Sequence, residues 1–305
     1  MAARGARSAA PDFHAEVDMS HAVSHSIVPE STLRTSEVEA FARDGFLIKR
    51  GLFARDEMRL LDEAFVGDRA MHRRAYAVAD DAGASTEIAL WNDPGDDLFG
   101  AFARCARMVR GAEALLGGEV YHYHSKITMK PPGGGGTWNW HQDYGYWYKN
   151  GCLYPDMLTV AVAMNAANRE NGCLEVIRGS HRLGRIEHGQ VGSQTGADPE
   201  RVRAVLERSE RVAFEAEPGD VMFFHCNTLH TSAPNRSQRP RDLFLIAYNA
   251  AANDPCLPHH HPGYTKLDVL PDDAIRARAG VWAGESRVFL DPAEDKSIYG
   301  FRRLG

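Results

Sequence analysis

The sequence lacks the features that mark membrane, secreted and nucleic-acid-binding proteins. No apolar run approaches the length that spans a bilayer. No cluster of Lys and Arg stands out, and the formal net charge is -6, so nothing suggests a nucleic-acid footprint. The 5 cysteines form no Cys-x-x-Cys pair, and their odd number makes a poor disulfide framework and a poor zinc site. These absences predict a cytoplasmic protein in a reducing compartment, with neither a membrane nor a nucleic-acid partner.

The composition is that of an ordinary globular protein. Hydrophobic residues make up 44% of the 305 residues and charged residues 25%, which allows a sizeable core. Residues 1–33 show no sustained periodicity, and we expect a flexible N-terminal tail there. Residues 34–305 are expected to form a single domain. The oligomeric state is left open between a monomer and a homodimer.

Helical patterns come first along the chain and strand patterns follow. Thr35 begins a helix-start pattern with acidic residues in the first turn. Further helices are predicted over residues 56–65 and 98–116, where apolar residues recur at helical spacing. From Val120 the chain changes to short β-rich runs separated by Gly, Pro and Asn. This order predicts an α+β chain with a mainly β core, built on a β-sandwich or barrel.

A His-x-Asp pair is the first sign of a metal site. On a strand end, His141 and Asp143 point to the same face, so an imidazole and a carboxylate can approach one ion. His230, which follows an apolar strand, is the best third ligand. Two His and one carboxylate form the facial triad of non-haem iron enzymes and leave three positions for a co-substrate and O2. Zinc could use the same three ligands.

Two side chains that follow His230 in the sequence, Ser232 and Arg241, favour iron with 2-oxoglutarate over zinc. Arg241 stands at the head of an apolar strand, where a guanidinium is suited to a bidentate grip on a carboxylate. Ser232 lies two residues after His230 and can face the same side. Together they could hold the distal carboxylate of 2-oxoglutarate while its keto-acid end chelates the metal. His230 is preferred over the nearby His225, because only His230 has both a serine two residues later and an arginine eleven residues later, which are Ser232 and Arg241.

Several short motifs also occur in one order from about Val38 to Ala250. They are Phe41–Ile48 (FARDGFLI), Lys130-Pro131-Pro132, His141-Gln142-Asp143, Glu170–Leu174 (ENGCL), Arg178–His181 (RGSH), Pro218-Gly219-Asp220 and His230-Thr231-Ser232. With these motifs the chain resembles the phytanoyl-CoA dioxygenase (PhyH) family of Fe(II)/2-oxoglutarate oxygenases. The resemblance implies a double-stranded β-helix, that is, a cupin-like jelly roll with flanking helices. It also implies Fe(II), 2-oxoglutarate and O2 as reactants, with His141, Asp143 and His230 as the ligands and catalytic residues.

The same resemblance suggests residues for the co-substrate and the substrate. Arg241 and Ser232 match the residues that bind the 2-oxoglutarate carboxylate. On the strand pattern from Val120 to Lys130, the residues Lys126, Thr128 and Lys130 are candidates for a further contact, and the sequence does not choose between the two lysines.

Around the first two ligands the chain is closest to the ectoine and free-proline hydroxylase branch of the family. In that branch the aromatic residue that matches Trp147 lies against the substrate, and a glutamine that faces the ligands stands where this chain has His124. Tyr144 and Trp140 are further candidate substrate contacts. The histidine in place of glutamine argues against ectoine itself, so the resemblance carries over the chemistry and a small-molecule substrate but not its identity.

The sequence leaves open the reaction outcome, two alternative functions and the role of the C-terminal region. Related halogenases have a small residue where this chain has Asp143, so hydroxylation or another oxidation is expected instead of halogenation. One alternative is an acyl-CoA 2-hydroxylase that would bind CoA through Arg178, Arg182 and Arg185, and a second is a cupin-like binding protein without catalysis. Residues from about 253 onwards include the run His259-His260-His261 and either cover the pocket or pack outside it.

Overall fold

The computed structural model describes residues 33–294 and 301–303. The tail predicted for residues 1–33 therefore lies, except for Leu33, outside the described residues. Within the described part of the chain, no helix is long and apolar enough to cross a membrane.

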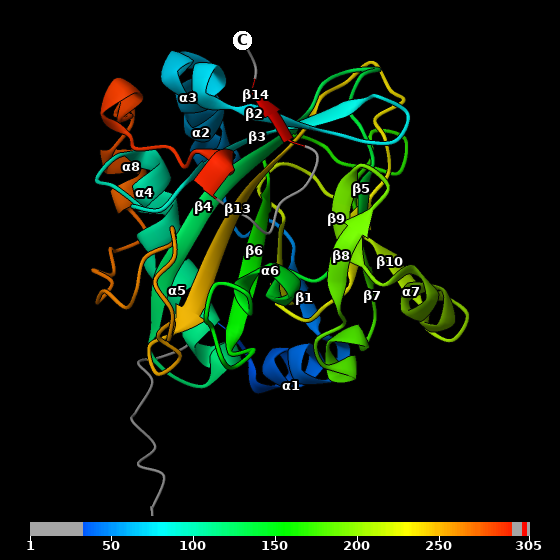
Figure 1. Ribbon diagram of the computed structural model, residues 1–305. Coiled ribbons are helices and arrows are strands. Elements are labelled where there is room, and N and C mark those ends of the chain that lie inside the picture. Colours follow the sequence, from blue (N-terminus) through cyan, green and yellow to red (C-terminus); the bar gives the residue numbers. More distant parts are fainter. Residues whose placement is uncertain (1–32, 295–300, 304–305) are drawn as a thin grey trace, which may run out of the picture.

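Two antiparallel β-sheets form the centre of the protein (Figure 1). In spatial order, the large sheet contains β1 (Phe46–Lys49), β11 (Val221–His225), β6 (Met157–Ala163), β13 (Arg241–Ala250), β4 (Val120–Lys130), β3 (Ser85–Trp91), β2 (Tyr76–Ala79) and β14 (Phe301–Arg303). The small sheet contains β10 (Arg211–Ala213), β7 (Leu174–Ile177), β12 (His230–Ser232) and β5 (Trp138–His141). A separate hairpin of β8 (His188–Val191) and β9 (Gln194–Ala197) lies beside β5.

Most helices cover the face of the large sheet that is turned away from the small sheet (Figure 1). The α-helices are α1 (Thr35–Asp44), α2 (Arg55–Gly67), α3 (Arg69–Arg74), α4 (Leu98–Arg104), α5 (Ala106–Leu116), α6 (Tyr144–Trp147), α7 (Pro199–Leu206) and α8 (Ala274–Ala277), and the 3-10 turns are η1 (Ser180–Leu183), η2 (Gly284–Ser286) and η3 (Pro292–Glu294). Phe53, Phe102 and Met108 join Phe223 and Phe244 of the sheet in the largest apolar core. Burial of this apolar layer holds the helices on the sheet.

The single helix predicted over residues 98–116 is wrong, because the chain breaks at Cys105 into α4 and α5. Cys105 has an extended backbone with φ -63° and ψ 147°. It forms a β-bridge to Leu270, with the Ala106 N–H donating to the Leu270 carbonyl and the Leu270 N–H donating to the Arg104 carbonyl. These tertiary hydrogen bonds to the C-terminal segment outweigh the local helical periodicity.

A β-bulge in β4 decides which of its side chains face the small sheet. His124 pairs with Ala247 and His122 pairs with Tyr248, so Tyr123 is one extra residue on β4. Before the bulge, Tyr121 and Tyr123 pack on the side of Trp147. After it, His124, Lys126 and Thr128 line cavities on that same side. Because of the bulge, odd-numbered residues of β4 face the interior between the sheets up to Tyr123, and even-numbered residues face it from His124 onwards.

The C-terminal segment, residues 251–294, returns to the large sheet, where Phe289 forms an antiparallel β-bridge with Trp91 at the end of β3. The Arg287 guanidinium forms a buried ion pair with Asp97 and lies 4.5 Å from the centroid of the Trp91 ring. The Leu290 N–H donates to the Leu90 carbonyl. Asp97 also accepts a hydrogen bond from the Gly100 N–H and so caps α4. One carboxylate thus joins a helix start to the returning segment.

Candidate metal centre

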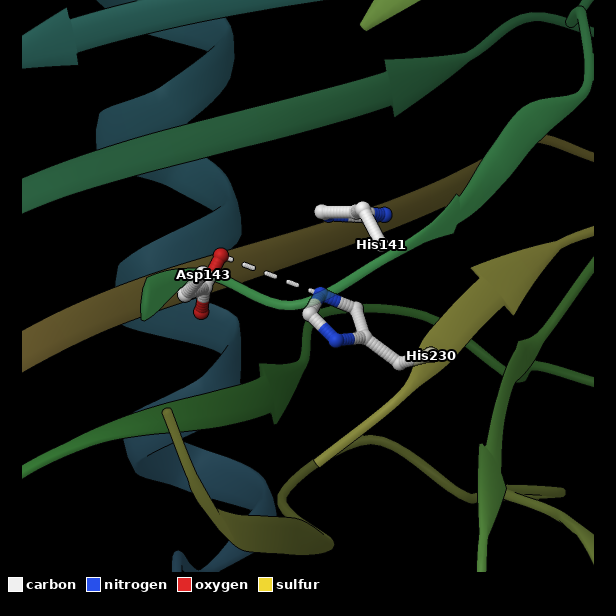
Figure 2. Close-up of side chains that lie close together, drawn as sticks. All are labelled: His141, Asp143 and His230. Carbon is white, nitrogen blue, oxygen red and sulfur yellow. Dashed lines mark ion pairs between the residues drawn. The ribbon is translucent and has the colours of Figure 1, made fainter. Parts of the chain in front are cut away.

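Three buried side chains converge between the two sheets: His141 at the end of β5, Asp143 just before α6, and His230 at the start of β12 (Figure 2). One ligand atom from each lies within 4.8 Å of the others. His141 and His230 are cross-strand partners of the antiparallel β12–β5 pair, and their ring centroids are 4.0 Å apart. The structure thus brings together the three residues that the sequence proposes as metal ligands.

In each of these three side chains, one polar atom forms a hydrogen bond to the surrounding protein. The other polar atom is left to face the two remaining ligands. The His141 Nδ1 is 2.8 Å from the Asn139 carbonyl, and the His230 Nδ1 is 2.9 Å from the Thr228 carbonyl. A carbonyl only accepts, so both Nδ1 atoms carry the proton and both Nε2 atoms keep a lone pair. This is the form of imidazole that coordinates a metal.

Asp143 is oriented in the same way. Its Oδ2 accepts a hydrogen bond of 2.6 Å from the Thr159 hydroxyl of β6. Its Oδ1 is left to face the His230 Nε2 at 3.8 Å, the contact drawn as a dashed line in Figure 2.

Burial keeps the two imidazoles neutral. It holds the pKa of His141 well below its usual range, and the neighbouring His230 acts in the same direction. Burial also lowers the pKa of His230, although the Asp143 carboxylate opposes the effect. Two neutral imidazoles and one carboxylate fit a divalent ion such as Fe(II), and this donor set leaves coordination positions open.

The residue between the first two ligands fixes the turn that carries them. The Gln142 N–H donates to the His188 Nε2 at 2.8 Å, and its side-chain amide donates to the carbonyls of Gly184 and Asn227. The His188 ring packs so closely on Gly145 that a Cβ there would lie 2.3 Å from it. The turn from Gln142 to Gly145 is therefore held by contacts that a larger residue at Gly145 would break.

His225, the alternative to His230, lies away from the cluster. Its Nδ1 accepts a hydrogen bond from the Asn227 N–H, and its ring lies 5.5 Å from that of His181 and 6.4 Å from that of Phe41. These contacts are with the turn after β11, with η1 and with α1.

A cavity of about 480 Å³, including its open mouth, extends from His141 and His230 to Arg241. Arg241 is buried, with its Nε donating to the Gly172 carbonyl and its Nη1 to the Thr128 hydroxyl. Burial lowers its pKa to about 10, which still leaves it charged at neutral pH. Ser232 also lines this cavity.

The two candidate lysines have different places. Lys126 lines the cavity, and its Nζ lies 4.0 Å from the Asp143 Oδ1. Lys130 is buried and donates to the carbonyls of Ser232 and Ala233, so it fixes the chain after β12. Lys126 is therefore the lysine that can meet a ligand.

A second cavity of about 610 Å³, including its mouth, adjoins the first at Lys126 and His141. His124 and Trp147, two of the four candidate substrate residues, line it. The other two do not. The Tyr144 hydroxyl is turned to the carbonyls of Cys152 and Leu153, because α6 directs this side chain into the core.

Trp140 also points away from this second cavity. It packs against the apolar cluster of Ile177 and under Arg211. Trp140 is next to the inward-facing His141 and so faces away by ordinary alternation. Trp138 lines the cavity instead, because a register shift opposite His230–Ser232 gives β5 an extra residue and brings Trp138 to the side of His141. The aromatic residues of β5 and α6 that line this cavity are thus Trp138, Tyr146 and Trp147.

Sequence reasoning missed most of the remaining cavity wall. These residues come from elements far away in the chain: Tyr76, Val78, Ile88, Leu90, Asn150, Gln194, Thr195 and His261. Strands β2 and β3, which carry the apolar members, were not predicted at all. Only their pairing through β4 brings them to the site, and no local pattern shows that pairing.

Comparison with known proteins finds that the chain matches one family model and is similar in sequence to several enzymes. The family model described as phytanoyl-CoA dioxygenase (PhyH) matches residues 27–243. The chain is 29% identical over 255 residues to an L-proline trans-4-hydroxylase of Streptomyces griseoviridis, covering 77% of this chain and 95% of that one. It is 28% identical over 242 residues to an ectoine dioxygenase of Bordetella parapertussis, covering 72% and 77%.

Solved structures agree with the predicted fold. The structure of EctD from S. alaskensis with bound Fe has a TM-score of 0.66 and 25% identity, and covers 80% of this chain and 90% of that one. The alpha-ketoglutarate-dependent carbocyclase SnoK has a TM-score of 0.60 at 20% identity, over 78% and 94%. The α+β fold with a jelly-roll core is thereby confirmed.

Proposed function

The chain belongs to the phytanoyl-CoA dioxygenase family and is an Fe(II)- and 2-oxoglutarate-dependent dioxygenase, and we propose that His141, Asp143 and His230 hold its iron. It oxidises a C–H bond of a small-molecule metabolite with release of succinate and CO2. The convergence of the three preoriented ligand atoms carries the assignment of the ligands. Zinc is the less suitable ion, because the cavity that adjoins the ligands ends in a buried arginine suited to a dicarboxylic co-substrate.

Bound iron supplies the activation of O2, coupled to oxidative decarboxylation of 2-oxoglutarate. The protein's own groups bind and orient. Arg241 and Ser232 hold the distal carboxylate of 2-oxoglutarate, with Thr128 keeping the guanidinium in place. Lys126 stands between the two cavities and screens the charge of Asp143. The apolar and aromatic walls exclude water from the reacting carbon.

Hydroxylation is the outcome that the ligand set favours. Asp143 would take the coordination position that a halide needs, so halogenation is not expected. A carboxylate held by the Thr159 hydroxyl is in place for coordination, which also argues against a binding protein that has lost catalysis.

The substrate is a small molecule and not an acyl-CoA. Of the three arginines considered for CoA, Arg178 pairs with Asp44 and Glu210, and Arg185 pairs with Glu187. Arg178, Arg182 and Arg185 are not among the described residues that line the cavity beside the metal centre. The relatives named for proline and ectoine fit a small substrate, and we propose one of comparable size with a partly apolar body.

We further propose one catalytic domain over residues 34–305, in the cytoplasm, as a monomer or homodimer. Support for the compartment comes from the 5 free cysteines and from the need to keep iron ferrous. Size-exclusion chromatography with light scattering would choose between the two oligomeric states.

The test is turnover of 2-oxoglutarate without added substrate. Purified protein with Fe(II), ascorbate and 2-oxoglutarate is expected to form succinate slowly, and Asp143→Ala is expected to lose both this activity and Fe(II) binding. Asp156→Ala, which removes a carboxylate outside the ligand cluster, serves as the control and should keep both. Full activity in Asp143→Ala would refute the assignment.

A further inference from the structure

A line of easily oxidised side chains begins beside the metal centre. Its first member is Trp147, whose backbone N–H donates to the Asp143 carbonyl at 3.2 Å. The Trp147 side chain is buried and lines the same cavity as His141 and Asp143. Cysteine is oxidised readily, and the electron-rich rings of tryptophan and tyrosine also give up single electrons. Trp147 is therefore a group that an oxidant formed at the metal centre can attack.

Tyr123 and Cys152 continue this line away from the cavity. The Tyr123 ring meets the Trp147 ring edge-on, and their centroids are 5.5 Å apart, as in other packed aromatic pairs. The Cys152 thiol donates to the Tyr123 hydroxyl, with 3.9 Å between the sulfur and the oxygen. Tyr123 and Cys152 are both fully buried. Each side chain thus contacts the next one in the line.

Asn249 joins this inner part of the line to Tyr121. The Asn249 Nδ2 donates to the Tyr121 hydroxyl at 2.9 Å and lies 4.0 Å from the Cys152 Sγ. Tyr121 is two residues before Tyr123 on β4, so the two rings share one face of the strand and pack in one cluster. Tyr121 is also fully buried.

The line reaches the surface at Tyr264. Its ring stands perpendicular to that of Tyr121, with 5.8 Å between the centroids, and its side chain is 42% exposed. The Tyr264 hydroxyl donates to the Glu119 Oε1 at 2.7 Å, and its N–H donates to the Asp254 Oδ1 at 2.6 Å. We call the five oxidisable side chains the relay: Trp147, Tyr123, Cys152, Tyr121 and Tyr264.

The outer end of the relay belongs to the C-terminal segment. Tyr264 is three residues after His261, which lines the cavity beside the metal centre. Residues from about 253 onwards therefore cover the pocket, which answers the question left open by the sequence. The same stretch of chain that closes the cavity also carries the exposed tyrosine.

Turnover without a substrate makes such a relay useful. If 2-oxoglutarate is decarboxylated and no C–H bond of a substrate is oxidised, an oxidising equivalent is left at the metal centre. Closure of the site keeps this oxidant from water but not from the surrounding side chains. Trp147 lines the cavity and would be oxidised first. An electron that arrives from the surface would spare it.

We propose that the relay from Tyr264 to Trp147 carries electrons to the metal centre when it is oxidised without a substrate, and so protects the cavity. Each transfer moves one electron from the outer residue to the inner one, and no bond between heavy atoms forms or breaks. As Tyr264 loses its electron, its phenolic proton passes to Glu119. The buried phenols and the thiol regain their protons as each is reduced by its outer neighbour.

The balance is completed at the two ends of the relay. A soluble one-electron reductant supplies an electron to Tyr264, which takes its proton back from Glu119. The metal centre takes up one electron together with a proton from water. This inference rests on the proposed function, because turnover of 2-oxoglutarate supplies the oxidant.

The experiment uses reduced cytochrome c, a one-electron donor that is too large to enter the cavity. The protein is basic, so the carboxylates of Glu119 and Asp254 beside Tyr264 favour its approach. The enzyme turns over Fe(II), 2-oxoglutarate and O2 without substrate or ascorbate, and with catalase to remove released peroxide. Absorbance measures oxidised cytochrome per succinate formed, and peptide mass spectrometry measures oxygen insertion into Trp147. We expect the wild type to oxidise the cytochrome and to keep Trp147 largely intact.

Two variants interrupt the relay at different depths. Tyr264→Phe removes its exposed end and Tyr123→Phe its inner part, and each should lower cytochrome oxidation severalfold and raise oxygen insertion into Trp147. Tyr264→Trp should restore both towards the wild type, because its ring can again give up an electron. A purely structural role of Tyr264 predicts the opposite order, since phenylalanine is closer to tyrosine in shape than tryptophan is.

Tyr148→Phe is the matched control. Tyr148 is 46% exposed, similar to Tyr264, but its ring packs on Tyr144 and under Arg185, away from the relay. This variant should behave as the wild type. No cytochrome oxidation by the wild type, no change in both Tyr264→Phe and Tyr123→Phe, or loss only in Tyr148→Phe would overturn the relay. Succinate is measured in the same samples: its absence from the wild type would overturn the proposed function as well, whereas succinate without cytochrome oxidation would overturn the relay alone.

Discussion

Replacing Thr159 by Val tests whether the orientation of Asp143 sets the affinity for iron. Val keeps the shape of Thr and removes the hydroxyl that donates to the Asp143 Oδ2 at 2.6 Å. The Oδ1 then loses the restraint that turns it to the His230 Nε2. Because Thr159 lies on β6 and does not belong to the ligand cluster, the change leaves the three ligand groups intact.

The size of the effect follows from the hydrogen bond that is lost. A hydrogen bond to a charged group contributes about 1.5–3 kcal/mol. With about 1.4 kcal/mol for each factor of ten, Fe(II) should bind about 10- to 100-fold more weakly. This agrees with the range usual for groups that orient a metal ligand, about 10- to 100-fold.

The measurement is an anaerobic titration with Fe(II), followed by calorimetry in the absence of 2-oxoglutarate. Thr86→Val is the matched control. Thr86 is 1% exposed, like Thr159, and its hydroxyl donates to the Gly136 carbonyl at 3.2 Å without contacting Asp143. We expect Thr86→Val to bind Fe(II) as the wild type does. If Thr159→Val also binds with wild-type affinity, the reasoning about the orientation of Asp143 is refuted.

Three further outcomes are expected. Arg241→Lys should raise the KM for 2-oxoglutarate about 10- to 100-fold with a smaller change in kcat, because a lysine cannot form the bidentate contact; steady-state kinetics with an unchanged KM would contradict this. Arg287→Met should lower the free energy of unfolding in urea by about 3–5 kcal/mol, since it leaves Asp97 buried without its partner, and Asp97→Asn in the same chain should restore part of the loss. Burial raises the pKa of Glu37, but hydrogen bonds from Lys49 and Arg34 outweigh it and lower the pKa from 4.5 to about 2. The stability that this adds is fully present above pH 4.5 and is lost as the pH falls to 2, so in acid titrations Glu37→Gln should lose less stability than the wild type over that window.

The parts of the site that lie on local motifs could be predicted from the sequence. His141 and Asp143 are two residues apart on a strand end, and two-residue periodicity is enough to bring them together. His230 and Arg241 are linked by their spacing of eleven residues in the sequence, although β12 and β13 lie in different sheets. The structure places all four around adjoining cavities.

The substrate cavity could not be predicted in the same way. Its apolar wall comes from β2 and β3, which precede the ligands by more than 40 residues and meet them only through sheet pairing. Trp138 and Trp140 lie two residues apart, so regular alternation on β5 would put both on one face, and only the register shift opposite His230–Ser232 separates them. His261 lies in a segment without strand or helix, where no periodicity indicates a position.

The bulge at Tyr123 works like a shift of reading frame within β4. Upstream of it the odd-numbered tyrosines face the interior, and downstream the even-numbered His124, Lys126 and Thr128 do. Deleting Tyr123 would restore regular alternation and force either the tyrosines or the ligand-facing residues to the helix-covered side. Anyone who grafts this strand onto a relative, or aligns the two by spacing alone, must therefore carry the extra residue along. Otherwise the histidine and lysine that the cavities need would point into the hydrophobic core.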